Sequence, residues 1–256
     1  MLLKFFVLFT VANHVANTVG HPHPHPQMKA EVSKLITEID DVHLSSKIML
    51  KLTDELADLK ITTGESLTLR CEVTTTPAAV FYWEKDGKIV QGDTELNLFE
   101  KVSNIGKKTV EMGQVSSTFN IPCATQSDAG LYKCVAVNGH RTVESQAEIQ
   151  VEGEDMKCPS QKHAAPQITQ LTEARFELSG NVATLVCRSD RRAHWAWQFD
   201  GKTIDVDQPK YELMPQGDLL IRDLKWEDMG DYVCIASNRY GEARAETFLY
   251  PTKPSE

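Results

Sequence analysis

The stretch DAGLYKCVAVN at residues 128–138 returns 100 positions later as DMGDYVCIASN at residues 228–238. Both copies read Asp-x-Gly-x-Tyr-x-Cys and lie in runs that alternate apolar with other residues, the pattern of a half-buried β-strand. An offset of 100 residues is the length of one small domain. The chain therefore contains the same small, strand-rich unit twice.

Each copy is preceded by a second cysteine and then a tryptophan. Cys71 ends the alternating run LTLRC and Cys187 ends TLVC, while Trp83 and Trp197 are each followed three residues later by Asp-Gly. The Asp-Gly pairs suit tight turns, because glycine tolerates positive φ. Together these residues resemble the immunoglobulin fold in both halves of the chain. The expected fold class is all-β, with two tandem immunoglobulin-like sandwiches of intermediate or C2-like type and an amino-terminal extension.

The resemblance implies structural roles for the motif residues. In an immunoglobulin sandwich a disulfide joins strands B and F, which here implies the bridges Cys71–Cys134 and Cys187–Cys234. The remaining motif residues would be a strand C tryptophan and a tyrosine corner in each domain, namely Trp83, Trp197, Tyr132 and Tyr232. The first copy is longer between its cysteines, and we expect the extra residues in 91–117 to add strands or a long loop.

Two cysteines remain, Cys123 before the E–F turn and Cys158 after strand G. These positions share one end of an immunoglobulin sandwich, so an intramolecular bridge is reasonable. It would close a loop of ~36 residues, worth ~3–4 kcal/mol on the chain-entropy model. The alternative is an intermolecular bridge that gives a dimer.

Composition and charge exclude several classes of protein. The 256 residues carry 27 Lys plus Arg against 36 Asp plus Glu, a net charge of −9. This sign argues against a nucleic-acid coat, whose affinity depends on Lys and Arg. A hydrophobic content of 41% is ordinary for a globular protein and argues against wholesale disorder.

The amino terminus indicates secretion. Lys4 precedes an apolar run at 5–12 that is too short to span a bilayer, so residues 1–20 read as a signal peptide and no membrane anchor is expected. Paired cysteines then indicate disulfides. The expected organisation is signal peptide 1–20, extension 21–53, first domain 54–152, linker 153–165, second domain 166–250 and tail 251–256.

The extension begins with HPHPHP at 21–26, where alternating proline favours extended polyproline II. Its three histidines either bind a metal or belong to a solvated spacer; we expect no metal site, because Pro22 lacks the amide that an amino-terminal copper or nickel clip needs. Farther on, apolar residues with helical spacing allow a short amphipathic helix that either packs on the first domain or stays disordered. They are Val32, Leu35, Ile36 and Ile39.

No motif of an enzyme occurs: Gly-x-Ser-x-Gly, His-Glu-x-x-His and Gly-x-Gly-x-x-Gly are all absent. We therefore expect no catalytic residue and no cofactor. A basic cluster lies around the B–C turn of the second domain and forms either a solvated loop or a contact for an acidic protein or a sulfated glycan. Its residues are Arg188, Arg191, Arg192, His194 and Trp195.

A signal peptide, two immunoglobulin domains, an extra cysteine pair and no anchor resemble the secreted two-immunoglobulin (zwei Ig) proteins of nematodes. That resemblance implies extracellular recognition in the nervous system, with binding to adhesion receptors or matrix proteins and maintenance of axon position. The architecture is also similar to an insect secreted protein that sequesters insulin-like peptides, which gives the rival expectation. An exposed apolar patch on one sheet face would favour this second function, because hormone capture needs a hydrophobic anchor site.

Overall fold

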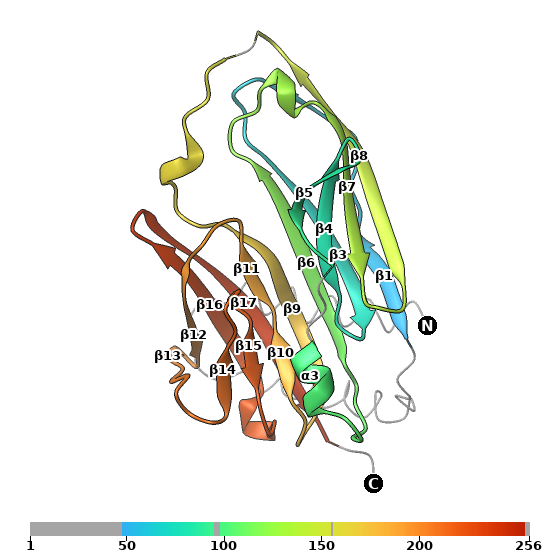
Figure 1. The fold of residues 1–256 in the computed structure, drawn as a ribbon, viewed down its shortest axis with the longest axis vertical. Helices are drawn as coiled ribbons and strands as arrows, with labels where there is room; N and C mark the ends of the chain where they lie inside the picture. The colour runs from blue at the N-terminus through green and yellow to red at the C-terminus, as the bar shows by residue number, and fades with distance from the viewer. Residues whose placement is uncertain (1–47, 95–97, 155, 254–256) are drawn as a thin grey trace, which may run out of the picture. The chain divides into compact units, whose positions relative to one another are not determined.

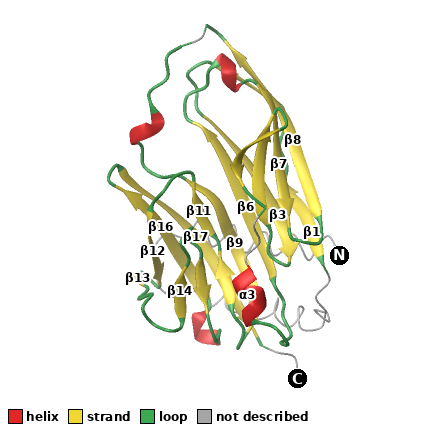
Figure 2. Ribbon diagram, in the orientation of Figure 1, coloured by secondary structure: helices red, strands yellow, loops and turns green. Residues whose placement is uncertain are grey.

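The computed structural model describes residues 48–94, 98–154 and 156–253. The expected signal peptide and most of the expected extension, including the His-Pro repeat and the apolar residues between Val32 and Ile39, lie outside the described residues. Figure 2 shows that strands dominate the described part and that its helices are short. The fold is all-β, as predicted.

The first sandwich packs a five-stranded sheet against three further strands (Figure 1). The five-stranded sheet has the order β2–β8–β7–β4–β5, with β2 parallel to β8. The opposite layer is β1–β3–β6, paired antiparallel. The bounds of these strands are β1 Met49–Asp54, β2 Leu59–Thr62, β3 Leu67–Thr76, β4 Val80–Lys85, β5 Lys88–Gly92, β6 Met112–Ile121, β7 Gly130–Val137 and β8 Thr142–Glu152.

The second sandwich repeats this plan with fewer residues. One layer is β9–β17–β16–β12–β13, and the other is β10–β15–β14. The short strand β11 pairs with the beginning of β9. The bounds are β9 Ile168–Leu178, β10 Ala183–Leu185, β11 Cys187–Ser189, β12 His194–Phe199, β13 Lys202–Thr203, β14 Tyr211–Leu213, β15 Leu219–Ile221, β16 Gly230–Asn238 and β17 Gly241–Thr252.

The two sandwiches share one sheet. β6 of the first pairs antiparallel with β9 of the second, from Met112 opposite Phe176 to Ser117 opposite Gln170. The result is a nine-stranded sheet with the order β1–β3–β6–β9–β17–β16–β12–β13 and β11 beside β9. Figure 1 shows the first half of β6 lying beside β9. A ladder of backbone hydrogen bonds therefore couples the two domains.

Each sandwich is built around its disulfide and tryptophan. Cys71–Cys134 and Cys187–Cys234 are inaccessible, as are Trp83 and Trp197. The indole nitrogens are satisfied, since Trp83 donates to Ser117 Oγ (2.9 Å) and Trp197 to Gly217 O (2.9 Å). The tyrosine corners are also present: the Tyr132 and Tyr232 hydroxyls donate to the carbonyls of Asp128 (2.8 Å) and Asp228 (3.0 Å).

The third disulfide is intramolecular and joins Cys123, two residues after β6, to Cys158 in the linker, with a Cα–Cα distance of 5.8 Å. The linker then forms a single 3₁₀ turn, η2 (Gln161–His163), in which the Ser160 hydroxyl accepts from Lys162 N (3.4 Å). The start of the linker is thereby tied to the first sandwich.

Three details differ from the expected organisation. β1 occupies residues 49–53 of the predicted extension, because Leu50 is buried in the first core. β17 continues to Thr252, two residues into the predicted tail, because it pairs with β9 up to Leu178. The extra residues 91–117 contain a short helix, α3 (Leu98–Ser103), rather than added strands or a plain loop.

Candidate functional site

Helix α3 attaches the first sandwich to the second. The Asn104 side chain, just past the helix, donates to Val182 O (2.8 Å) and accepts from Val182 N (2.9 Å). Lys107 Nζ donates to Gly180 O (3.0 Å). Asn104 is 4% exposed, so this two-way amide contact is shielded from water. The inserted segment thus supplies the hydrogen-bond partners that water would otherwise provide to the backbone of Gly180 and Val182, which follow β9.

A buried charge cluster lies beside this contact. Arg175 of β9, only 2% exposed, donates to Glu100 of α3 and to Glu177 Oε2 (3.2 Å). Glu100 Oε2 also accepts from Thr184 N (2.7 Å). Burial raises the pKa of the Glu100 carboxyl, while the adjacent Arg175 guanidinium opposes that rise. One guanidinium therefore compensates two carboxylates that come from different sandwiches.

Glu177 connects the same cluster to the backbone of the first sandwich. Its carboxylate accepts from Val110 N (2.9 Å) and Glu111 N (3.0 Å), which precede β6. It also accepts from Leu178 N (2.8 Å) and Asn181 Nδ2 (3.0 Å). A carboxylate with no exposed surface is stable only when its oxygens are satisfied in this way. The junction is consequently a specific structure and not a loose contact.

The opposite side of α3 is apolar and faces outward. Phe99 and Val102 of α3, and Ile105 two residues past its end, have exposed fractions of 62%, 64% and 76%. We call these residues the α3 stripe. Exposed apolar side chains that gather on one small element commonly mark an interface. In the sequence, these residues are spaced i, i+3, i+6, which indicates one face of a helix. The prediction of strands or a long loop for residues 91–117 did not take this spacing into account.

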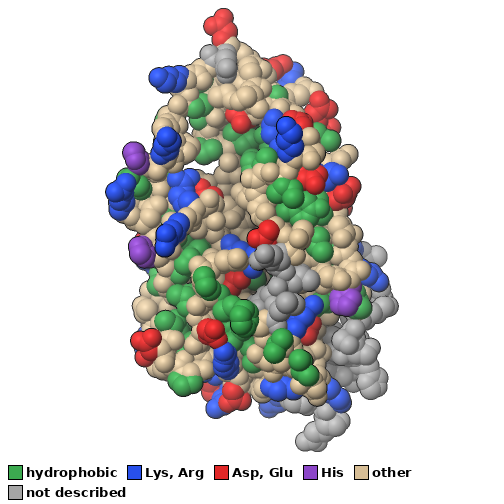
Figure 3. Space-filling model, in the orientation of Figure 1, with side chains coloured by type: hydrophobic (Ala, Val, Ile, Leu, Met, Phe, Trp, Pro, Cys, Tyr) green, Lys and Arg blue, Asp and Glu red, His purple; other side chains and the backbone are tan. Residues whose placement is uncertain are grey.

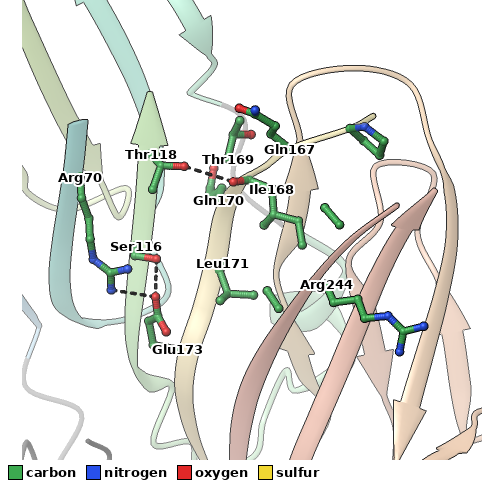
Figure 4. A pocket seen from close by; sticks show the side chains of 13 residues that line it. Arg70, Ser116, Thr118, Gln167, Ile168, Thr169, Gln170, Leu171, Glu173 and Arg244 are labelled. Atoms are coloured by element: carbon green, nitrogen blue, oxygen red, sulfur yellow. Dashed lines mark hydrogen bonds and ion pairs between the residues drawn. The ribbon is translucent and has the colours of Figure 1, made fainter. Parts of the chain in front are cut away.

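A shallow groove of about 350 Å³ runs across the shared sheet where β6, β9 and β17 meet. Figure 4 shows the Arg70 guanidinium and the Ser116 hydroxyl converging on Glu173, at 2.9 Å and 2.6 Å from Oε1. Thr118 donates to Ile168 O (3.1 Å). Arg70, Ser116 and Glu173 are therefore already bonded to one another, and Thr118 is bonded to the backbone.

The polar side chains of the groove form a small network. Ser116 donates to the Glu173 carboxylate, which also forms an ion pair with Arg70. In the described ranges, no group of His, Cys, Asp and Glu side chains is arranged to hold a metal ion. No described helix has the length and apolar character needed to cross a membrane.

The structure separates the five residues of the predicted basic loop. Arg188 forms a part-buried ion pair with Asp218 (2.9 Å) and so acts within the second sandwich. Trp195 packs against the second core and lies over Gly217, whose φ of +113° and contact with the indole exclude a side chain. Both residues are structural.

The other three residues remain near the surface. Arg191 pairs with Asp190 (2.6 Å), and its Nη1 donates to Gln161 O (2.7 Å) in the linker. The hydrogen bond to Asp190 raises the pKa of the Arg191 guanidinium, which therefore stays charged. Arg192 and His194 are exposed. Only this part of the predicted loop is available to a partner.

Comparison with known proteins agrees with the repeat read from the sequence. Residues 50–151 match the immunoglobulin I-set domain and residues 165–238 match an immunoglobulin domain. Domains of this class are generally non-enzymatic.

Relatives extend over nearly the whole chain. Zwei Ig domain protein zig-3 of Caenorhabditis elegans is 58% identical over 91% of this chain and 93% of its own. Zwei Ig domain protein zig-4 of the same species is 44% identical over 98% and 96%. The crystal structure of neural ectodermal development factor IMP-L2 is 26% identical, covers 80% of this chain and 95% of its own, and has a TM-score of 0.61. The similarity thus includes both sandwiches.

Proposed function

Since the chain belongs to the zwei Ig family of two-immunoglobulin-domain proteins, we propose that it is a secreted, non-enzymatic recognition protein of the nervous system that acts in cell adhesion and in maintaining axon position. Its partner would be an extracellular protein, either an adhesion receptor or a matrix component. The signal peptide read from residues 1–20 and three disulfides support an extracellular site of action.

The observation that carries this proposal is the α3 stripe at the junction of the sandwiches. Val102 and Ile105 are 64% and 76% exposed, on a segment whose other side is fixed to the second sandwich through Asn104 and Glu100. Rigid attachment matters, because a partner that binds a preorganised surface loses less conformational entropy on ordering it. A few side chains buried near the centre of an interface carry most of its binding energy, and the α3 stripe offers such side chains to a partner.

The test is binding of the mature protein to neural adhesion-receptor ectodomains on a biosensor. Wild type is compared with the Val102→Glu/Ile105→Glu variant and with Ile89→Glu/Val90→Glu, which alters two apolar side chains on β5 that are 60% and 45% exposed. We expect the α3 variant alone to lose at least ~10-fold in affinity, since anchor truncations cost ~2 kcal/mol or more. Equal binding by all three proteins would contradict the role of the stripe.

The neural role has its own measurement. Deleting the gene in the animal that carries it should displace axons after development while leaving their outgrowth normal, and secreted wild-type protein should restore their position. Normal axon position without the protein would overturn the role in axon maintenance, whatever the biosensor shows.

A second candidate function is capture of insulin-like peptides, which the similarity to an insect hormone-sequestering protein implies. The α3 stripe is the kind of exposed apolar feature that capture of a hormone needs, although it lies on a helix and not on a sheet face. Insulin-like peptides therefore belong in the same biosensor panel. Saturable sub-micromolar binding to a peptide, with none to the receptors, would favour this function over adhesion.

A further inference from the structure

Three segments that are distant in sequence bring positive charge together at the start of the second sandwich. They are the linker turn η2, the β11–β12 loop and the β16–β17 turn. We call the result the basic surface; its residues are Lys162, His163, Arg191, Arg192, His194 and Arg239. Figure 3 shows Lys, Arg and His side chains gathered at the upper left, over the linker and the β16–β17 turn.

Direct contacts hold the three segments in place. Arg191 Nη1 donates to Gln161 O (2.7 Å), which joins the β11–β12 loop to the linker. Asn238 Nδ2 donates to Ala164 O (2.9 Å), which joins the β16–β17 turn to the linker. The rings of His163 and Tyr240 lie 5.2 Å apart. The linker itself is fixed upstream by its disulfide, so the cations are presented by a defined structure.

The basic surface is not neutralised by the protein. Asp190 pairs with Arg191. No described carboxylate lies within ion-pair distance of Lys162, Arg192 or Arg239, and the Arg239 guanidinium lies over the Tyr240 ring, 4.7 Å from its centroid. This excess of positive charge occurs in a chain whose net charge is −9. A local cluster of positive charge on a protein whose net charge is negative attracts anionic ligands.

From this arrangement we infer that the basic surface binds a sulfated polysaccharide, the anionic polymer class of extracellular matrix and cell surfaces. Exposed cations held side by side match a chain of sulfate groups, and the His163–Tyr240 pair offers aromatic faces to sugar rings. An acidic protein fits less well, because a protein interface needs an apolar centre. Of the described large hydrophobic side chains that are exposed, only Tyr240 belongs to this surface.

The basic surface is separate from the α3 stripe. Ala164 and Ala165 precede β9, whereas Gly180 and Val182, which contact the α3 segment, follow it. An eleven-residue strand spans ~35 Å, so the two surfaces lie at opposite ends of β9. A matrix polysaccharide and a protein partner can therefore be bound together. Loss of one interaction leaves the other measurable.

The experiment is heparan sulfate binding by the disulfide-intact protein at physiological ionic strength. The test variant is Lys162→Glu/Arg192→Glu/Arg239→Glu, and the matched control changes three exposed, unpaired lysines elsewhere by the same charge. The control is Lys51→Glu/Lys88→Glu/Lys202→Glu. We expect the test variant to bind at least ~10-fold more weakly and the control to change less than ~3-fold, with wild-type affinity falling as salt rises.

Each possible result decides the inference. All six substituted side chains are exposed, and thermal unfolding of both variants checks that they fold. The assignment is supported if the wild-type protein binds heparan sulfate but does not bind the same polymer after its sulfate groups are removed. Failure of wild type to bind, or an equal loss in both variants, overturns it. Equally tight binding to polyglutamate would assign the basic surface to an acidic polypeptide instead.

Discussion

Replacement of Arg175 by methionine tests whether the buried charge cluster couples the two sandwiches. Arg175 is 2% exposed, and its guanidinium also donates to Met112 O (3.1 Å) and Phe176 O (3.0 Å). Methionine fills similar space without charge, so Glu100 and Glu177 would be left as two buried carboxylates with no compensating cation. Breaking a buried pair in this manner costs about 3–5 kcal/mol. Small domains unfold with only ~5–15 kcal/mol in total, so this loss would be large.

The assay is equilibrium unfolding in urea, with the disulfides intact, followed by tryptophan fluorescence and far-ultraviolet circular dichroism. Wild type should unfold in one transition, because the β6–β9 ladder and the cluster join the sandwiches. The Arg175→Met variant should show a lower midpoint and separate transitions for its two halves.

Two further variants make the reasoning refutable. Glu100→Gln in the Arg175→Met background removes one uncompensated carboxylate and should recover part of the loss. Arg222→Met is the control, since Arg222 pairs with Glu212 where both side chains are more than 40% exposed, and it should cost less than ~1 kcal/mol. A loss below ~1 kcal/mol for Arg175→Met, or a further loss on adding Glu100→Gln, would show that the cluster does not stabilise the junction.

The remaining predictions concern the linker, α3 and pH. Serine at both Cys123 and Cys158 should lower the free energy of unfolding by about 3–4 kcal/mol and speed proteolysis of the linker, measured by urea unfolding and limited digestion. Asn104→Ala leaves the buried amide and carbonyl of Val182 without partners and should cost about 1–3 kcal/mol in the same assay. Burial raises the pKa of Asp231 to about 6, so the cost of its ionisation to the folded state grows from pH ~4 and is complete above pH ~6. Asp231→Asn should therefore stabilise the protein by less than ~1 kcal/mol at pH 8, with no gain below pH ~4, and equal stabilisation at both values would contradict this assignment.

The sequence was sufficient for the two sandwiches, because the residues that define each core are local and repeated. Trp83 and Trp197 follow their first cysteines in similar frames, and their burial depends on the domain that contains them. The family resemblance then implied the pairings within each core.

The shared sheet could not be read in the same way. In β9, Glu173, Arg175 and Glu177 alternate with apolar residues, which is typical of a strand with one face in water. Arg175 and Glu177 are instead covered by the segment from Glu100 to Met112 of the other sandwich. That contact depends on how the two sandwiches pack together, and the sequence pattern of either sandwich alone does not predict it.

The sequence alone also predicts the residues of the candidate binding surfaces only in part. Arg191, Arg192 and His194 were found from their proximity in sequence, but Arg188 belongs to the core of its domain through Asp218. Lys162 and Arg239 join the surface from segments 29 or more residues away, and only contacts between loops place them there.

The pairing of β6 with β9 has a consequence for assembly. A strand at the margin of a sheet carries a row of unpaired N–H and C=O groups that can recruit strands from other molecules. Each sandwich here covers one such margin of the other, so two strand margins that could recruit other molecules are removed. The same pairing leaves β1 and β13 as the outermost strands of the nine-stranded sheet, so a strand from another molecule that extended this sheet would have to pair with one of them.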